Sequence, residues 1–361
     1  MLFLIPAVAF SISGNFFGIN YWYFDRLSPD DFKAVENTLK DIEVDTIRIG
    51  GLWYDANGIR TWVLEDFFKL CDDLGATPIV QIPLNGHSPE DMVSFAKKVR
   101  RIYKKKIIWS VGNEPDIYKI LNLSWLKKES LDEVIKKYEK FLAEFQKDGD
   151  ILIFPDITSL WRDPKTVKRF LKFKPDVFSI HRYPFGHVKN ESEILEDPEI
   201  FYEEMKNLKR RVKIPIALTE TNLSWDWNFR GKLSAEGEFA GIWLVSIYLR
   251  AIALDLWNIS VWSTVNDSAL SLLLVKDGTV IERPTFGFIK VFKNIPRNLT
   301  SYKLSKYIDW IKLGKTLIIV NRSKKARKIF VDGKEYRLHP LSVARYDGEK
   351  RVFERSVNIG M

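Results

Sequence analysis

The stretch Ile107-Ile108-Trp109-Ser110-Val111-Gly112-Asn113-Glu114-Pro115 decides how the rest of the sequence is interpreted. Its apolar start is the pattern of a buried strand, and the strand ends by presenting an Asn and a Glu side by side. A second apolar run, Pro215-Ile216-Ala217-Leu218-Thr219-Glu220, ends on a Glu in the same manner. The two runs predict two buried strands, each with a carboxylate at its end.

Similar apolar runs, rich in β-branched and aromatic residues, recur along the chain at intervals of about 25 to 45 residues. Amphipathic stretches separate them, which is the pattern of repeated βα units. Eight such units predict an α/β fold, a (β/α)8 barrel. The predicted strands are Phe16–Asn20, Thr46–Gly50, Pro78–Ile82, Ile107–Val111, Ile151–Pro155, Val177–His181, Ile214–Thr219 and Ile259–Ser263.

Helix-start signals support this division. Ser28 and Ser88 each precede a Pro and two acidic residues, so each is a candidate N-cap with Pro at the first helical position. Ser130 and Glu133 fit a capping box. An open doubly wound sheet is the alternative, but it would need a Gly-rich phosphate-binding turn after the first strand, and none follows there.

The chain of 361 residues has room for a barrel of about 250 residues and a small second domain. We expect the barrel to occupy residues 15–296, with Pro284–Ile295 as its last helix. The runs beyond it are separated by Asp332-Gly333 and Asp347-Gly348, which are hairpin turn signals. We therefore expect residues 297–361, joined by an N-terminal strand within 1–14, to form a small β-sandwich.

Composition narrows the function classes. The net charge is +9, but the Lys and Arg residues do not cluster or alternate with aromatics, so nucleic acid is not favoured as a partner. Cys71 is the one cysteine, and the four His residues form no His-x-His or His-Glu-x-x-His pair. We therefore expect no disulfide, no metal and no cofactor. Abundant Lys, Glu and Ile with very little Gln resemble the usage of heat-adapted proteins.

The apolar opening Leu2–Phe10 lacks a basic region before it and is too short to span a bilayer. A signal peptide is one interpretation of this segment. The preferred interpretation is a strand of the small domain. We therefore expect a protein without a membrane span that is cytoplasmic rather than secreted. The sequence fixes no oligomeric state.

Barrel enzymes carry their chemistry at the carboxyl ends of the strands, so we considered those positions for the site. They are more polar and aromatic than packing requires. They comprise Asn20, Trp22, Arg48, Asn85, Asn113, Glu114, His181, Tyr183, Glu220, Trp262 and Asn266.

Two carboxyl groups at such positions fit the cleavage of a glycosidic bond, where one protonates the leaving oxygen and the other attacks or activates water. Glu114 and Glu220 are the predicted pair. Arg48 can reach Glu220 and keep it ionised, and Tyr183 can donate to the same carboxylate. Asn113 can bind the sugar hydroxyl next to the reacting carbon.

Other candidates concern the sugar itself. We interpret His181 as a neutral hydrogen-bonding residue, with a core histidine as the alternative, and Trp262 as a stacking floor or as barrel packing. Arg182, Arg230 and Lys232 could bind a uronate, although surface positions are the simpler interpretation. Several aromatic residues suggest more than one sugar subsite: Trp22, Tyr23, Trp53, Trp225 and Trp227.

Together these motifs resemble the clan A retaining β-glycoside hydrolases over roughly residues 15 to 295. The motifs are Gly-Asn-Glu-Pro on the fourth strand, Leu-Thr-Glu-Thr on the seventh, Arg48, His181 with Tyr183, and Trp262. The resemblance implies that Glu114 is the acid/base and Glu220 the nucleophile. The segment Leu272–Gly278 and the β-domain after it are similar to glycoside hydrolase families 39, 79 and 30.

The prediction is therefore a retaining glycosidase whose substrate is a β-glycoside, an oligosaccharide or a polysaccharide. Two alternatives stay open. A transglycosylase would use the same covalent intermediate with a sugar acceptor in place of water. A non-catalytic carbohydrate-binding barrel would keep the tryptophans without needing paired carboxylates.

Overall fold

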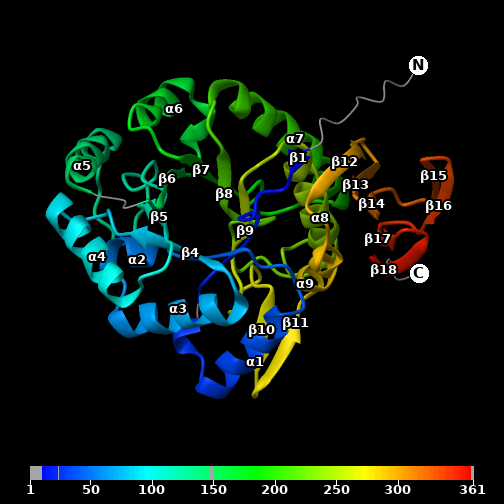
Figure 1. Cartoon of the computed structure of the whole chain (residues 1–361), viewed down its shortest axis with the longest axis horizontal. Coiled ribbons are helices and arrows are strands. Elements are labelled where there is room, and N and C mark those ends of the chain that lie inside the picture. Colours follow the sequence, from blue (N-terminus) through cyan, green and yellow to red (C-terminus); the bar gives the residue numbers. More distant parts are fainter. Residues whose placement is uncertain (1–9, 23, 146–148, 359–361) are drawn as a thin grey trace.

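The computed structural model describes residues 10–22, 24–145 and 149–358, and its centre is a closed barrel of eight parallel strands (Figure 1). Each strand overlaps one of the eight predicted runs, so the predicted (β/α)8 barrel is confirmed. The strands are β2 (Phe17–Asn20), β3 (Thr46–Ile49), β4 (Thr77–Ile82), β5 (Ile108–Val111), β6 (Ile151–Ile157), β7 (Val177–Arg182), β8 (Ile216–Thr221) and β9 (Asn258–Val261).

Helices surround the barrel as an outer ring (Figure 1). The predicted N-caps are confirmed, because the side chains of Ser28, Ser88 and Ser130 each accept a hydrogen bond from the backbone N–H three residues on. The helices are α1 (Pro29–Leu39), α2 (Leu52–Asn57), α3 (Thr61–Leu74), α4 (Pro89–Ile102), α5 (Leu131–Glu144), α6 (Pro164–Leu171), α7 (Glu191–Arg211), α8 (Glu238–Ala253) and α9 (Pro284–Ile289), with 3-10 turns η1 (Phe24–Arg26), η2 (Leu160–Arg162) and η3 (Lys290–Phe292).

The character of the strands changes along the barrel axis. Ile108 and Ala217 belong to a small apolar cluster near the strand starts. Because side chains on one face of a strand repeat every two residues, Ser110 and Thr219 follow them on the same face. Both of these polar residues are fully buried. The barrel interior therefore has an apolar layer near the strand starts and a polar layer further along the strands. A functional site can form in the polar layer.

The C-terminal region is a six-stranded antiparallel sheet, with strands in the order β1-β12-β13-β14-β17-β18, and a separate hairpin, β15–β16. Alternate residues serve two cores: Ile311 and Ile318 join the barrel core, whereas Trp310 and Ile319 pack with the hairpin. The predicted β-sandwich is confirmed. Its strands are β1 (Phe10–Ser11), β12 (Asn298–Lys303), β13 (Ile308–Leu313), β14 (Thr316–Asn321), β15 (Arg327–Val331), β16 (Lys334–Leu338), β17 (Ser342–Asp347) and β18 (Lys350–Ser356).

A further hairpin, β10 (Leu273–Lys276) and β11 (Thr279–Glu282), was not predicted and lies beside α1 (Figure 1). Asp277 and Gly278 connect its strands with φ angles of 51° and 73°. Two consecutive positive φ values are those of a type I′ turn. The last barrel helix is also shorter than predicted, because α9 ends at Ile289 and η3 follows.

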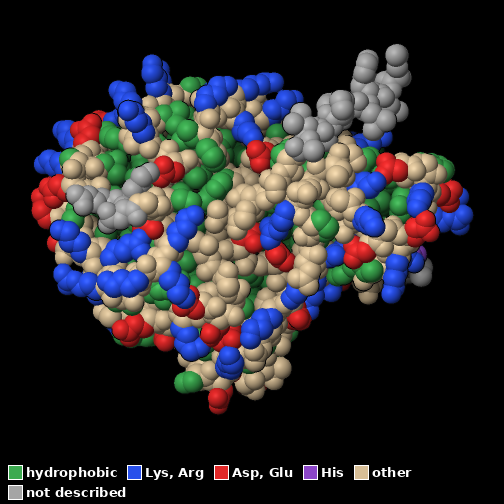
Figure 2. All heavy atoms as spheres, viewed as in Figure 1, with side chains coloured by type: hydrophobic (Ala, Val, Ile, Leu, Met, Phe, Trp, Pro, Cys, Tyr) green, Lys and Arg blue, Asp and Glu red, His purple; other side chains and the backbone are tan. Residues whose placement is uncertain are grey.

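The chain enters the structure through β1, which pairs with β12 in the register Phe10↔Leu299. The rest of the apolar opening, residues 2–9, lies outside the described residues, and the domain boundaries at 14 and 296 stay a prediction. Among the described helices, none combines the length and apolarity that crossing a bilayer requires. Figure 2 shows Lys and Arg interspersed with Asp and Glu over one face of the molecule, rather than gathered in one patch.

A buried ion cluster joins the two domains. Arg322 of the sheet domain lies 2.9 Å from Glu199 of α7 and 3.2 Å from Asp309 of β13, measured between nitrogen and oxygen atoms. Arg250 of α8 pairs with the same two acids. Both arginines and Asp309 are buried, so each charge depends on its partners for the solvation that water no longer supplies.

We predict that Arg322→Met lowers the free energy of unfolding by about 3 kcal/mol, because it leaves Asp309 buried with one partner fewer. Urea unfolding followed by tryptophan fluorescence measures the change. Arg337→Met, which removes an exposed arginine paired with Glu335, is the matched control and should change stability by less than about 0.5 kcal/mol. Equal effects of the two substitutions would contradict a stabilising role for the cluster.

Candidate active site

The ends of β5 and β6 adopt an uncommon backbone conformation. Glu114 and Asp156 have φ angles of 52° and 51°, in the left-handed region that costs a side-chain-bearing residue about 1–2 kcal/mol. The N–H of Glu114 donates to the carbonyl oxygen of Asp156 at 2.9 Å, which ties the two turns together. Gly112, with a φ of 74°, has no room for a side chain, because a Cβ there would lie 2.5 Å from Leu84. The turn thus fixes where the Glu114 side chain begins.

Arg48 is fully buried at the centre of this end of the barrel. Its guanidinium donates to Glu220 at 2.6 Å, to Asn113 at 2.8 Å and to Asp156 at 3.1 Å. It also donates to Asn20 at 3.1 Å. One cation therefore holds side chains from several strands in a single arrangement.

Glu220, at the end of β8, is held by two donors. Besides Arg48, the hydroxyl of Tyr183 donates to its other carboxylate oxygen at 2.8 Å. Both contacts anticipated from the sequence are present. Burial and the two nearby glutamates raise the pKa of Tyr183 well above its ordinary value, so this hydroxyl stays a proton donor.

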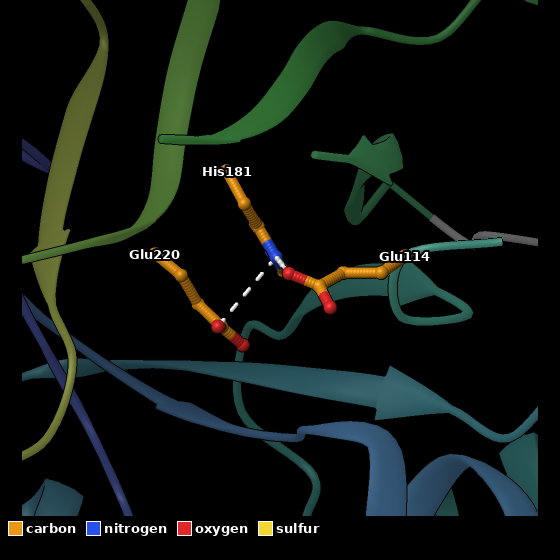
Figure 3. A group of neighbouring side chains, drawn as sticks. All are labelled: Glu114, His181 and Glu220. Atoms are coloured by element: carbon orange, nitrogen blue, oxygen red, sulfur yellow. Dashed lines mark hydrogen bonds and ion pairs between the residues drawn. The ribbon is translucent and has the colours of Figure 1, made fainter. Parts of the chain in front are cut away.

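Glu114 faces Glu220 with His181 between them (Figure 3). One carboxylate oxygen of each Glu and one nitrogen of His181 all lie within 4.8 Å of one another. The Nδ1 atom of His181 is 3.0 Å from Glu114 and 3.5 Å from Glu220. Burial raises the pKa of Glu114, and the charge of Glu220 raises it further, against the opposing effect of His181.

The electrostatics of the site favour a charge on His181 that the sequence did not predict. Burial alone would lower its pKa, but the negative charges of Glu220, Asp156 and Glu114 outweigh burial and raise the pKa to about 10. The surrounding charges therefore favour a protonated ring over the neutral one expected from the sequence. The ring lies among carboxylates, with Nε2 3.8 Å from Asp156.

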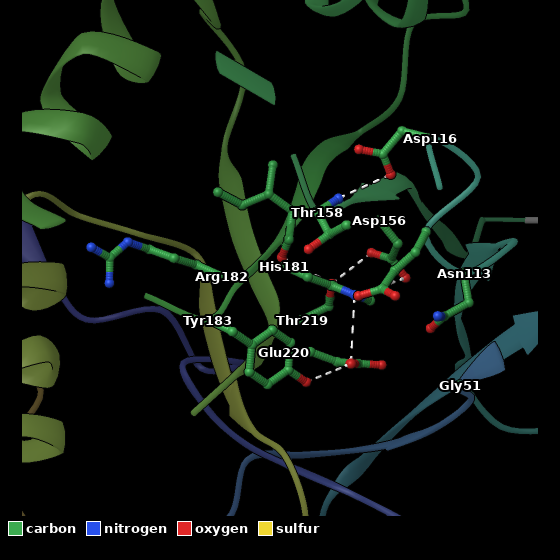
Figure 4. A network of polar contacts seen from close by, with 12 residues as sticks. Gly51, Asn113, Asp116, Asp156, Thr158, His181, Arg182, Tyr183, Thr219 and Glu220 are labelled. Atoms are coloured by element: carbon green, nitrogen blue, oxygen red, sulfur yellow. Dashed lines mark hydrogen bonds and ion pairs between the residues drawn. The ribbon is translucent and has the colours of Figure 1, made fainter. Parts of the chain in front are cut away.

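Asp156 is the residue that sequence reasoning missed. It is fully buried and accepts hydrogen bonds from Arg48, Ser110 and Thr219. Figure 4 shows Asp156 near His181 and Thr219. Arg48 and His181 outweigh burial and hold the pKa of Asp156 well below its ordinary value. A usable signal was present, because Asp156 directly follows the predicted strand Ile151–Pro155 at its carboxyl end.

The remaining predicted residues divide into two groups. Asn20 is buried, and its amide donates to backbone oxygens of Thr219 and Val261, so it joins neighbouring strands. Trp22 and Trp262 lie together, with ring centroids 5.2 Å apart, and Trp262 also packs against Gly51. Both rings are half-buried, and each follows the carboxyl end of a barrel strand, β2 or β9. Tyr23, proposed with them, lies outside the described residues.

Several polar residues at this end have structural partners. Asn85 bonds to both backbone groups of Lys127, and Asn266 donates to Ser263. Arg182 is not on the surface, as the simpler interpretation had it. It is buried and forms a two-pronged ion pair with Asp197.

Glu114, His181 and Glu220 are also the one group of described residues whose spacing could hold a metal ion. The chemistry of the site disfavours one. Arg48 already lies 2.6 Å from Glu220, so a cation there would meet a fixed positive charge. A protonated His181 also offers no lone pair to a metal.

The fold is shared with several solved glycosidases, although no protein family model matches the chain. The GH51 α-L-arabinofuranosidase of Thermotoga petrophila RKU-1 superposes with a TM-score of 0.70 at 16% identity, over 95% of this chain and 97% of that one. The GH39 β-xylosidase of Caulobacter crescentus gives 0.64 at 12%, over 94% and 84%. For the GH30 xylanase C of Talaromyces cellulolyticus the values are 0.59 at 11%, over 90% and 88%. The predicted resemblance to families 39 and 30 is thus confirmed in fold.

Among curated proteins, a glutamate–tRNA ligase of Sulfurihydrogenibium sp. (strain YO3AOP1) is 24% identical over 179 residues. The match covers 45% of this chain and spans 37% of the length of that protein. A likeness this distant and partial shows no family.

We predict that His181 keeps its proton far above the ordinary range of histidine. In a ¹⁵N NMR titration its ring should stay doubly protonated through neutral pH and lose the proton only as the pH approaches about 10. His87 is the internal comparison, because burial lowers its pKa. His181→Gln identifies the signal by its disappearance. Four histidine rings that all deprotonate below about pH 8 would contradict the charge assigned to His181.

Proposed function

We propose that the protein is a retaining glycoside hydrolase that cleaves β-glycosidic bonds by double displacement. The observation that carries this proposal is the pair of carboxylates at the ends of β5 and β8, with oxygens within 4.8 Å. Retaining enzymes hold their two carboxyl groups about 5–5.5 Å apart, whereas inverting enzymes need about 6.5–9.5 Å to admit a water. The spacing of Glu114 and Glu220 favours the first class.

The two carboxyl groups have environments suited to different roles. Glu220 receives hydrogen bonds from Arg48 and Tyr183, which favour a charged and oriented nucleophile. In the first step its oxygen bonds to the anomeric carbon as the glycosidic bond breaks. Glu114, whose pKa is raised, gives its proton to the leaving oxygen. The product of this step is a glycosyl ester on Glu220.

The second step needs Glu114 as a base, and the electrostatics of the site favour the change. Once Glu220 is an ester it is neutral, so the negative charge that raises the pKa of Glu114 is gone. His181, 3.0 Å away, stabilises the carboxylate that Glu114 has become. Glu114 can then take a proton from water while the water oxygen attacks the anomeric carbon and releases Glu220.

Substrate contacts complete the proposal. Arg48 occupies the side-chain oxygen of Asn113, which leaves the amide NH₂ to donate to the hydroxyl next to the reacting carbon. Trp22 and Trp262 offer a floor on which the sugar can stack. Neighbours of the fold named as a β-xylosidase and a xylanase are consistent with a glycoside substrate.

The division of roles predicts different losses in two variants. Glu220→Gln should lower kcat at least about a thousandfold on every glycoside, because no nucleophile remains. Glu114→Gln should lower kcat/KM, which reports the first step, about 10²–10⁴-fold on alkyl glycosides but less than about tenfold on dinitrophenyl glycosides, whose leaving group needs no proton. Release of the aglycone and of sugar measures both, and ¹H NMR should detect the β-anomer as the first product.

Glu129→Gln is the matched control, since Glu129 is a buried carboxylate on the segment between β5 and α5 that pairs with Lys137. It should leave kcat unchanged. Equal losses for Glu114→Gln on all leaving groups would refute the acid/base assignment, and the α-anomer as first product would refute retention.

A further inference from the structure

The described part of the chain exposes five tryptophans, and all of them follow the carboxyl ends of barrel strands. Four lie in the segments after β3, β5 and β8, and one is the second residue of α3, the helix that follows β3 and α2. Apolar rings left in water at one end of a molecule mark a binding surface. They are Trp53 (47% exposed), Trp62 (45%), Trp125 (37%), Trp225 (65%) and Trp227 (59%).

Trp53 and Trp125 fix each other. Trp53 is on α2, directly after β3, and Trp125 lies between β5 and α5. Their ring centroids are 5.3 Å apart with the planes at 69°, an edge-to-face contact. Each ring is thereby oriented before a ligand arrives, while much of its surface stays open to solvent.

Trp225, after β8, is held by a different device. Its backbone N–H donates to Phe185 at 2.9 Å, and its ring lies on Gly186, where a Cβ would come within 2.5 Å. The hydroxyl of Ser224 donates to the carbonyl of Gly186 at 2.6 Å. A glycine is required beneath the ring, so the segment is built to present an exposed indole in one position.

These two platforms stand on opposite sides of the barrel. In the closed ring β4 lies between β3 and β5, and it is four strands from β8 in either direction. Glu114 and Glu220 come from β5 and β8, so the reacting bond lies between the Trp53–Trp125 pair and Trp225. A ligand that contacts both platforms must cross the carboxylates.

We propose that the substrate is an uncharged, β-linked oligosaccharide or polysaccharide that stacks on Trp53 with Trp125 and on Trp225, and that its internal bonds are cleaved. This inference rests on the proposed function. An uncharged substrate is favoured because the three cations that could have bound a uronate already have carboxylate partners: Arg182 pairs with Asp197, Arg230 with Glu236, and Lys232 with Glu191.

The test compares chain length within one sugar. The β-linked hexasaccharides of xylose, glucose, mannose and galactose are each assayed against the 4-nitrophenyl β-glycoside of the same sugar. For one of the four sugars, kcat/KM on the hexasaccharide should exceed kcat/KM on the monoglycoside by at least about tenfold. The first products from that hexasaccharide should come from cleavage of internal bonds. Trp53→Ala and Trp225→Ala should each lower kcat/KM on that hexasaccharide about tenfold and leave the monoglycoside within about twofold.

Phe330→Ala is the control, because Phe330 is 68% exposed on β15 of the other domain and should change neither rate. Release of single sugars from one end, or a loss in only one tryptophan variant, would overturn binding on both sides. A hexasaccharide no better than the monoglycoside would overturn it too. Tryptophan variants that change only the oligomeric state, measured by sedimentation, would also overturn the proposal. The rings would then bind a second copy of the protein instead of a sugar.

Failure of the chemistry is distinguishable from failure of the platforms. If the wild type cleaves nothing, calorimetry with Glu220→Gln and the same hexasaccharides decides the second question. Binding that Trp53→Ala and Trp225→Ala each weaken would support the platforms without the hydrolase. Binding of none of the hexasaccharides would overturn them.

Discussion

The site depends on one buried guanidinium. The guanidinium of Arg48, on β3, donates to side chains at the ends of five other barrel strands. These side chains are Asn20, Gln81, Asn113, Asp156 and Glu220. A cation removed from water costs several kcal/mol unless its donors find acceptors, so these side chains have one arrangement that satisfies it. With Glu114 protonated, Arg48 and His181 balance the charges of Asp156 and Glu220. The protonation state that the first step of the proposed reaction requires is therefore electrically neutral within this group.

Much of this could be predicted from local pattern. Strand ends are readable because buried parallel strands are short apolar runs and because barrels keep their chemistry at one end. Glu114, Glu220 and Arg48 were found in this way. Asp156 was not found, because the predicted strand ended at Pro155. The strand in fact continues to Ile157, and Asp156 lies within it with a backbone in the left-handed region. Asp277-Gly278 is likewise a recognisable hairpin turn signal. The strands that it connects are short and largely exposed, so they lack the apolar pattern of a buried strand.

Other features could not be predicted from sequence at all. The charge of His181 depends on three carboxylates that lie between 25 and 67 residues away along the chain, and only the closed barrel brings them together. The same holds for Arg182, whose partner Asp197 turns a presumed surface cation into a buried one. In both cases a long-range charge decides the state of the residue, and local propensity carries no information about it.

The ion cluster of Arg250, Arg322, Glu199 and Asp309 has a consequence for heat. The cost of taking charges out of water falls as temperature rises, because hydration of ions is entropically unfavourable. The attraction between the charges remains. The contact between barrel and sheet domain therefore contributes more to the free energy of unfolding in hot solution than in cold, whereas the gain from each buried apolar surface levels off. On warming, the junction between the domains is reinforced relative to the cores that it joins.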